Sequence, residues 1–178
     1  VMQFISMGLR FGTFSITLTL IPIVVGSALY GWGSGAWLGF VFGVTVLLTG
    51  DATLFLAVNI PGTIITVILK GALAGAAAGF VYKLISKKNQ IAAVIVSALV
   101  APVVNTGIFV LGSYVFFFDY LSGLAEGTNL FVFILVGLVG INFFIELGIN
   151  LVLNPAILQI IRIGKKNFGG KNQIIKTK

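Results

Sequence analysis

The sequence predicts an all-α membrane protein, a bundle of helices that crosses the bilayer several times. Charged residues make up 8% of the chain and hydrophobic residues 58%, whereas a soluble domain carries about 25% charged residues. The apolar residues form long continuous runs without period-two alternation, which favours helices over the strands of a barrel. The charged residues lie mainly at the ends of these runs, as expected for loops on either side of a membrane.

Five apolar stretches are expected to form the bundle, at residues 17–30, 36–48, 64–85, 91–118 and 130–163. A spanning helix needs about 20 apolar residues, so the last three stretches are long enough and the first two are near or below the limit. The glycine-rich segment 31–35 favours a turn between two short spans over one re-entrant hairpin. The chain begins within a further apolar segment, so we expect a first helix to be missing from this sequence.

The distribution of charge predicts how the bundle is oriented. The loop after the third stretch and the C-terminal region are basic, through Lys83, Lys87, Lys88, Arg162, Lys165, Lys166, Lys171, Lys176 and Lys178. Because basic loops face the cytoplasm, we expect both regions there, in the cell membrane, and the acidic loops outside. The expected division is a transmembrane domain at 1–163 and a solvated, partly disordered basic tail at 164–178.

The residue inventory argues against an enzyme. The chain contains no His, no Cys and four acidic residues, which removes the commonest general base and the commonest ligands of transition metals. The net charge is +7, but it is divided between segment ends, which favours membrane topology over nucleic-acid binding. We therefore expect no catalytic residue, metal, cofactor or nucleic-acid partner.

Glycine recurs at every fourth position in two of the stretches. The two ladders are Gly35, Gly39 and Gly43, and Gly71, Gly75 and Gly79. Small residues at this spacing let helix backbones approach closely. The ladders therefore indicate either packing inside the bundle or an interface with another membrane subunit.

Polar side chains inside the apolar stretches are candidates for a binding site, because such groups are costly in lipid. In the last stretch they recur every four residues and wind along one side of a helix, as Asn142, Glu146, Asn150 and Asn154. Glu146 is the only acid deep in a stretch, and it suits either a ligand site or a buried structural hydrogen bond. Asn150 and Asn154 are more typical of hydrogen bonds between helices.

The fourth stretch contains Pro102, which frees a backbone carbonyl one turn earlier. Asn105 and Thr106 follow it, an arrangement typical of the interrupted helices at transporter binding sites. Lys70 begins the second glycine ladder, where its ammonium group either extends to the interface or meets an anion. Arg10 and Asn59, in the outward loops, either help to close a site or are solvated.

Several short motifs follow one another along the chain, at residues 10–17, 20–26, 35–43, 50–51 and 70–75, with Pro-Val-Val-Asn-Thr-Gly at 102–107. This ordered set resembles the substrate-binding S component of an energy-coupling factor (ECF) vitamin transporter, over nearly the whole chain except the tail. The resemblance implies a six-helix membrane protein that binds a vitamin near its outer face. It also implies a transmembrane coupling subunit and two cytoplasmic ATPase subunits as partners. The sequence contains no phosphate-binding loop pattern, so ATP hydrolysis would belong to separate chains.

The segment at 102–107 is most similar to S components of the pantothenate type. For that cargo, the resemblance implies Lys70 or Arg10 as the partner of the carboxylate, and Asn105, Thr106 and Asn142 as partners of the hydroxyls and amide. Glu146 suits a neutral or cationic vitamin better, so pyridoxine- and pyrimidine-like cargoes remain open, as do riboflavin and folate types. Two other functions also remain open: a stand-alone transporter coupled to protons through Glu146, and a structural subunit without a ligand.

Overall fold

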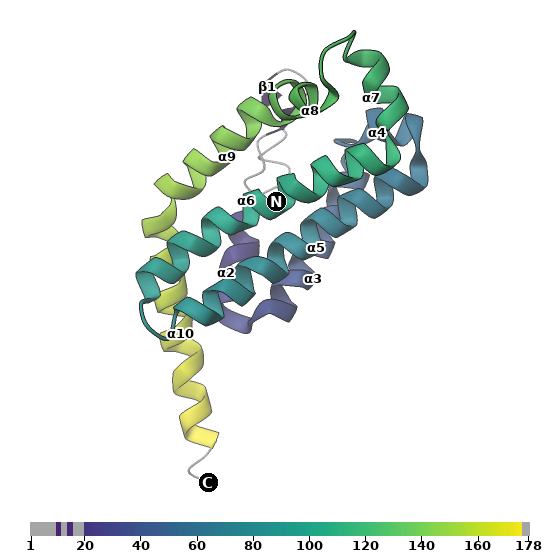
Figure 1. Ribbon diagram of the computed structural model, residues 1–178. Coiled ribbons are helices and arrows are strands. Elements are labelled where there is room, and N and C mark those ends of the chain that lie inside the picture. The colour runs from purple at the N-terminus through teal and green to yellow at the C-terminus, as the bar shows by residue number, and fades with distance from the viewer. Residues whose placement is uncertain (1–9, 12–13, 16–19, 176–178) are drawn as a thin grey trace.

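The computed structural model describes the backbone of residues 10–11, 14–15 and 20–175, and the side chains of residues 20–140 and 143–166. Figure 1 shows an elongated bundle of helices. The helices are α2 (Leu20–Tyr30), α3 (Trp32–Leu48), α4 (Thr53–Val58), α5 (Ile60–Ile85), α6 (Gln90–Phe116), α7 (Phe118–Leu124), α8 (Leu130–Val132), α9 (Ile141–Val152) and α10 (Asn154–Ile175). The π-helical segment η1 (Phe133–Gly140) joins α8 to α9. The short strands β1 (Arg10–Phe11) and β2 (Phe14–Ser15) pair antiparallel.

Three of the described helices are long and apolar enough to cross a membrane. They are α3 together with the residue that follows it (Trp32–Thr49), α5 and α6. A fourth span results if the pair Leu130–Gly140 and Phe143–Val152, which meet at an angle of 42°, is counted as one. The predicted all-α membrane bundle is therefore confirmed.

Two of the predicted spans differ from the structure. Helix α2 has 11 residues, which is too short to cross the hydrocarbon core of a bilayer. The stretch at 130–163, expected to be one span, is divided among α8, η1, α9 and the start of α10. Its apolar residues are continuous, but the π-helical segment bends the helix axis, and α9 ends before Leu153.

The two glycine ladders face each other where α3 packs against α5. A β-carbon at Gly35 would collide with the carbonyl oxygen of Gly75, and one at Gly39 would collide with that of Gly71. In the same way, a β-carbon at Gly71 would collide with the carbonyl oxygen of Gly39, and one at Gly75 would collide with that of Gly35. The two backbones are thus in direct contact, which only residues without a side chain allow.

The remaining two ladder positions are also covered from within the chain. A β-carbon at Gly43 would lie 2.8 Å from the carbonyl oxygen of Val67, and one at Gly79 would lie 2.7 Å from Cα of Trp32. The six glycines therefore pack inside the bundle, which is one of the two roles that the ladders indicated, and an interface with a partner subunit stays a prediction.

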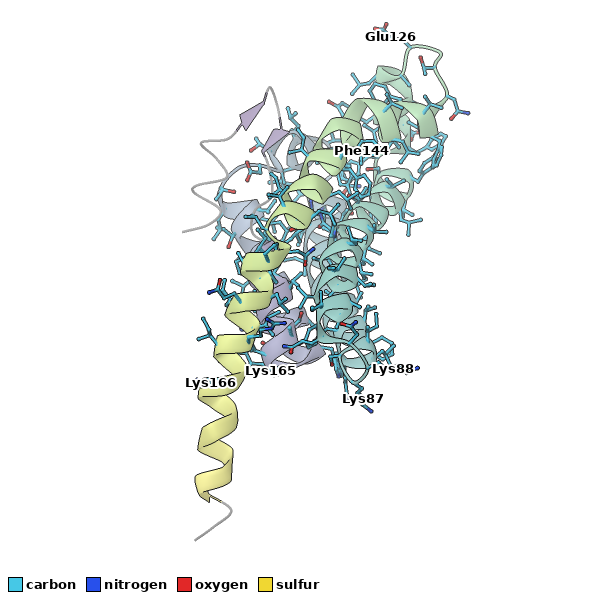
Figure 2. The ribbon with its side chains drawn as sticks, turned by 90° about the vertical axis from the view of Figure 1, so that its left-hand side faces the viewer. Lys87, Lys88, Glu126, Phe144, Lys165 and Lys166 are labelled. Carbon is cyan, nitrogen blue, oxygen red and sulfur yellow. The ribbon has the colours of Figure 1, made fainter. Side chains whose placement is uncertain are left out.

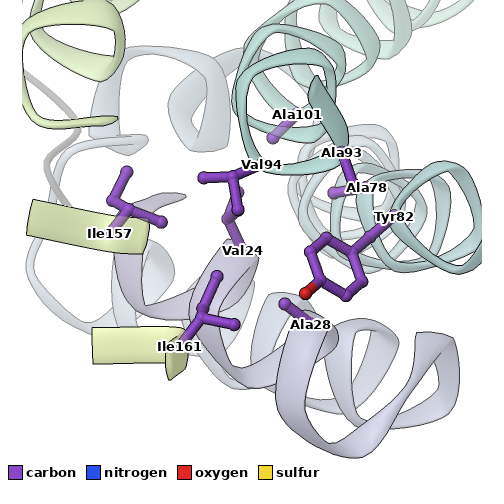
Figure 3. Packing of buried hydrophobic residues seen from close by; sticks show 9 residues of the cluster. All are labelled: Val24, Ala28, Ala78, Tyr82, Ala93, Val94, Ala101, Ile157 and Ile161. Atoms are coloured by element: carbon purple, nitrogen blue, oxygen red, sulfur yellow. The ribbon is translucent and has the colours of Figure 1, made fainter. Parts of the chain in front are cut away.

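One hydrophobic core joins four helices around the end of the bundle where α5 turns into α6. Its buried residues are Val24, Ala28, Ala78, Tyr82, Ala93, Val94, Ala101, Ile157 and Ile161. Figure 3 shows the ring of Tyr82 directed toward Ala28, and Ile157 and Ile161 of α10 on the side of Val24. Burial of these two isoleucines anchors the first turns of α10 to α2 and α6.

Basic and acidic residues lie at opposite ends of the bundle. Lys87, Lys88, Lys165 and Lys166 lie at one end, and Glu126 lies at the other (Figure 2). Helix α10 extends beyond the bundle at the basic end (Figure 1). Residues 164–175, expected to be partly disordered, continue this helix.

Candidate functional site

A cavity of about 250 Å³ lies among α3, α5, α6 and α9, and residues of α4, α7 and η1 complete its lining. Helices α4 and α7 lie at the end of the bundle opposite the turn from α5 to α6 (Figure 1), so the cavity is nearer the acidic end. Its polar lining residues are Asp51, Thr63, Thr66, Lys70, Asn105, Thr106, Tyr120 and Glu146. The structure thus brings four of the predicted site residues together: Lys70, Asn105, Thr106 and Glu146.

Helix α5 presents one polar face to the cavity. Thr63, Thr66 and Lys70 line the cavity, and their spacings of three and four residues place them on the same side of the helix. The helix begins where Asn59 Oδ1 accepts a hydrogen bond of 2.9 Å from the backbone N–H of Gly62. This cap sets the start of α5, and with it the direction of the polar face.

Helix α6 supplies Asn105 and Thr106 from within a continuous helix. It runs from Gln90 to Phe116 through Pro102, so the expected interruption of the helix at this proline is not seen. The proline still removes one backbone donor. Asn105 and Phe109 are four residues apart, and both line the cavity.

The charged groups of the cavity gather around Lys70. Glu146 of α9 and Asp51, in the turn between α3 and α4, both lie close enough to attract the Lys70 ammonium group. Lys70 Nζ also lies 5.4 Å from the ring centroid of Phe109, within the range of a cation–π interaction. Thr49 Oγ1 donates a hydrogen bond of 2.9 Å to Oδ2 of Asp51, which restrains that carboxylate.

Two buried polar atoms in the cavity lining have no hydrogen-bond partner among the described residues. They are Thr66 Oγ1 and Asn105 Oδ1, on side chains that are 4% and 7% exposed. Buried polar groups are nearly always hydrogen-bonded, and leaving one unpaired costs about 1–3 kcal/mol. These atoms are therefore suited to bind a polar molecule in the cavity.

Aromatic rings form the side of the cavity near α4 and α7. Phe55 packs edge-on against Phe109, with ring centroids 5.5 Å apart, and against Phe117, at 5.0 Å. Phe42, Tyr120 and Phe143 also line the cavity. Such a wall accepts a flat ring through edge-to-face or stacked contacts. The cavity therefore offers both a polar cluster and an apolar platform, as small-molecule sites do.

The other predicted site residues lie elsewhere or are not described. Asn59 does not line the cavity; its side chain caps α5 and donates a hydrogen bond of 3.3 Å to the carbonyl oxygen of Phe116. The side chains of Arg10 and Asn142 lie outside the described part of the chain. Asn150 and Asn154 are buried but do not line the cavity. Of the described polar side chains that recur every four residues along this helix, Glu146 alone therefore lines the cavity.

We expect Asn59→Ala to lower stability without changing ligand affinity. The substitution removes the N-cap of α5, which costs about 1 kcal/mol, and also the hydrogen bond to α6. Asn89→Ala is the matched control, because Asn89 caps α6 through Ile91 and Ala92 and its side chain makes no hydrogen bond to another helix among the described residues. Thermal unfolding in detergent should show the larger loss for Asn59→Ala. A lower ligand affinity in the Asn59→Ala variant would instead show that Asn59 contributes to the binding site.

Sequence reasoning missed several lining residues, notably Asp51, Thr63 and Thr66. The spacing of Thr63 and Thr66 relative to Lys70 is a helical signal that could have identified the two threonines. Asp51 has no such signal, since an acidic residue in a loop is ordinarily solvated. Among the described residues, no group of three or more acidic, His or Cys side chains could hold a metal ion.

Comparison with known families gives one match. Residues 1–158 match the model of a family described as ECF transporter, substrate-specific component. No curated protein matches the chain. No solved structure matches it either.

Proposed function

Because this chain belongs to the ECF transporter substrate-specific component family, we propose that its cavity captures a vitamin at the outer face of the cell membrane for import. A substrate-specific subunit of an ECF transporter is a transport subunit and not an enzyme. The observation that carries the proposal is the pair of buried, unpartnered atoms, Thr66 Oγ1 and Asn105 Oδ1, in a cavity that Lys70 and Glu146 also line. A stable membrane bundle has no need for such a cluster.

The charge distribution supports the proposed orientation. The basic residues Lys87, Lys88, Lys165 and Lys166 lie at one end of the bundle (Figure 2), and basic segments favour the cytoplasm. The C-terminus is then cytoplasmic, and the cavity lies toward the outer face. A transmembrane coupling subunit and two cytoplasmic ATPase subunits would complete the transporter, since ATP hydrolysis needs a phosphate-binding loop that this sequence lacks.

Pantothenate is the cargo that the sequence resemblance favours. Its carboxylate would meet Lys70, and its hydroxyls and amide would meet Asn105 and Thr106, which all line the cavity. Equilibrium binding of a panel of vitamins to the full chain in detergent tests the function. Tight binding of one vitamin supports a substrate-binding subunit. If folded protein binds none of them, the proposal fails, and a structural subunit or a proton-coupled transporter becomes the better hypothesis.

We expect Asn105→Ala to weaken binding of the cargo about tenfold, because loss of one well-placed hydrogen bond costs about 1.4 kcal/mol. We expect the same direction for Asn142→Ala. Thr45→Ala is the control, since the Thr45 hydroxyl donates a hydrogen bond to the carbonyl of Val41 on its own helix and Thr45 does not line the cavity. Wild-type affinity in a folded Asn105→Ala variant would remove Asn105 from the site.

A further inference from the structure

Among the described side chains, a basic belt of six exposed residues lies at one end of the bundle. The belt comes from the last turn of α5, the turn that follows it, and α10. Its members are Lys83, Lys87, Lys88, Arg162, Lys165 and Lys166. Figure 2 shows Lys87 and Lys88 on one side of this end and Lys165 and Lys166 on the other, at about the same level along the bundle. The positive charge is therefore spread over two sides of the bundle rather than gathered on one face.

No acidic side chain of the sequence lies at the same end of the bundle as the basic belt. The whole sequence contains four acidic residues. Asp51 and Glu146 line the cavity and attract Lys70. Asp119 belongs to α7, at the opposite end, where Glu126 also lies. The belt is therefore open to anions from outside the chain.

Two contacts hold α10 at the basic end of α5. Lys165 Nζ lies 5.0 Å from the ring centroid of Tyr82, within the range of a cation–π interaction, and Tyr82 directly precedes Lys83 of the belt. A β-carbon at Gly164 would lie 2.8 Å from Cδ2 of Leu29, so α10 packs closely on α2 just before its two lysines. The basic residues at the start of this projecting part of α10 are thus placed by tertiary contacts.

The basic belt lies at the depth where a spanning helix meets lipid headgroups. Helix α5 has 26 residues and is about 39 Å long, more than the roughly 30 Å of the hydrocarbon core, so its ends reach the headgroups. Exposed apolar side chains adjoin the belt on α5 and on α10: Phe80, Leu84, Ile160 and Ile163. A phospholipid can therefore lay its acyl chains against these residues while its phosphate meets the ammonium groups.

We infer that the basic belt binds anionic phospholipid headgroups in the leaflet at this end of the bundle. Clusters of Lys and Arg next to spanning helices are attracted to anionic lipid surfaces. A bilayer contacts a spanning bundle from every side, whereas a partner subunit covers one side. The spread of the belt over two sides therefore favours lipid over an acidic protein surface. The inference depends neither on the cargo nor on which side of the membrane this end faces.

Native mass spectrometry of the full chain tests the inference, after equilibration in micelles that hold equal amounts of phosphatidylglycerol and phosphatidylcholine. We expect the chain to retain phosphatidylglycerol about fivefold more than phosphatidylcholine, the advantage that one basic residue gains near an anionic surface. Equal retention would overturn the inference and leave the belt to an acidic protein surface. Vitamin binding is measured separately, so failure of one proposal leaves the other standing.

Two matched variants test whether the charge of the belt causes the preference. The fourfold variant Lys87→Gln, Lys88→Gln, Lys165→Gln and Lys166→Gln should lose it, and the same four residues changed to Arg should keep it. Thermal unfolding identifies the folded variants. If the fourfold Gln variant does not fold, because Lys165 contacts Tyr82, the pair Lys87→Gln and Lys88→Gln decides. These two lysines lie in an exposed turn, and their loss should lower the preference about twofold or more. Undiminished preference in the folded Gln variant, or its loss in the Arg variant, would overturn the inference.

Discussion

Gly39→Leu is expected to unfold much of the protein. Any side chain at this position meets the carbonyl oxygen of Gly71, so α3 and α5 would have to move apart along their whole contact. Inserting atoms into a close-packed interface costs about 1–3 kcal/mol, and the cost should reach or exceed the upper end here because the obstacle is backbone rather than a movable side chain. Thermal unfolding in detergent, with the yield of monodisperse protein, measures the effect.

The control for this prediction is Gly148→Leu. A β-carbon at Gly148 meets nothing within 4 Å, although the residue also lies in a helix, α9. The two variants change helix propensity and hydrophobicity equally, so the difference between them reports the collision alone. Similar unfolding temperatures for the two variants would contradict the direct contact between the backbones of α3 and α5.

Lys70→Met is expected to lower stability by about 3 kcal/mol, whichever cargo the cavity takes. The substitution removes a cation that both Glu146 and Asp51 attract, and removal of one partner from a buried set of charges costs about 3–5 kcal/mol. The loss of stability should lie at the lower end of this range because Lys70 is only partly buried. Unfolding in denaturant or by heat provides the measurement.

A second substitution separates charge from packing. Lys70→Met combined with Glu146→Gln removes the buried carboxylate along with the cation that it attracted, so the double variant should recover part of the lost stability. Lys83→Met is the control on the same helix, because Lys83 is exposed in the last turn of α5 and should change stability little. A double variant less stable than Lys70→Met would show that Glu146 is not destabilised by loss of the lysine.

Much of the fold could be predicted because its strongest signal is local. The runs that became α5 and α6 exceed the length of a span, and their bounds differ from the prediction by only a few residues. The division of the apolar run at 130–163 into several helical segments could not be predicted from hydropathy. Hydropathy measures whether a segment prefers lipid, but a π-helical turn at Phe133–Gly140 depends on how the helix packs against its neighbours.

The candidate site shows the same division between local and tertiary information. Lys70 and Glu146 were identified because charged groups are rare at membrane depth. Asp51 was missed because it belongs to the site only through the turn that brings it beside Lys70. The spacing of the glycines predicted close packing of helices. It could not predict which helix covers each ladder, because that depends on the tertiary contact between α3 and α5.

The shortness of α2 has a consequence for how the protein is made. At 11 residues, this helix is about 16 Å long, roughly half the hydrocarbon thickness of a bilayer. Its residues from Leu20 to Leu29 are buried or partly buried, and some of the residues that bury it belong to α10, at the other end of the chain. The translocation machinery cannot retain so short a segment by its hydrophobicity alone. Helix α2 can pack against α3 and α5 early, but its burial is complete only after ribosomal synthesis has released α10, so its docking ends late in the assembly.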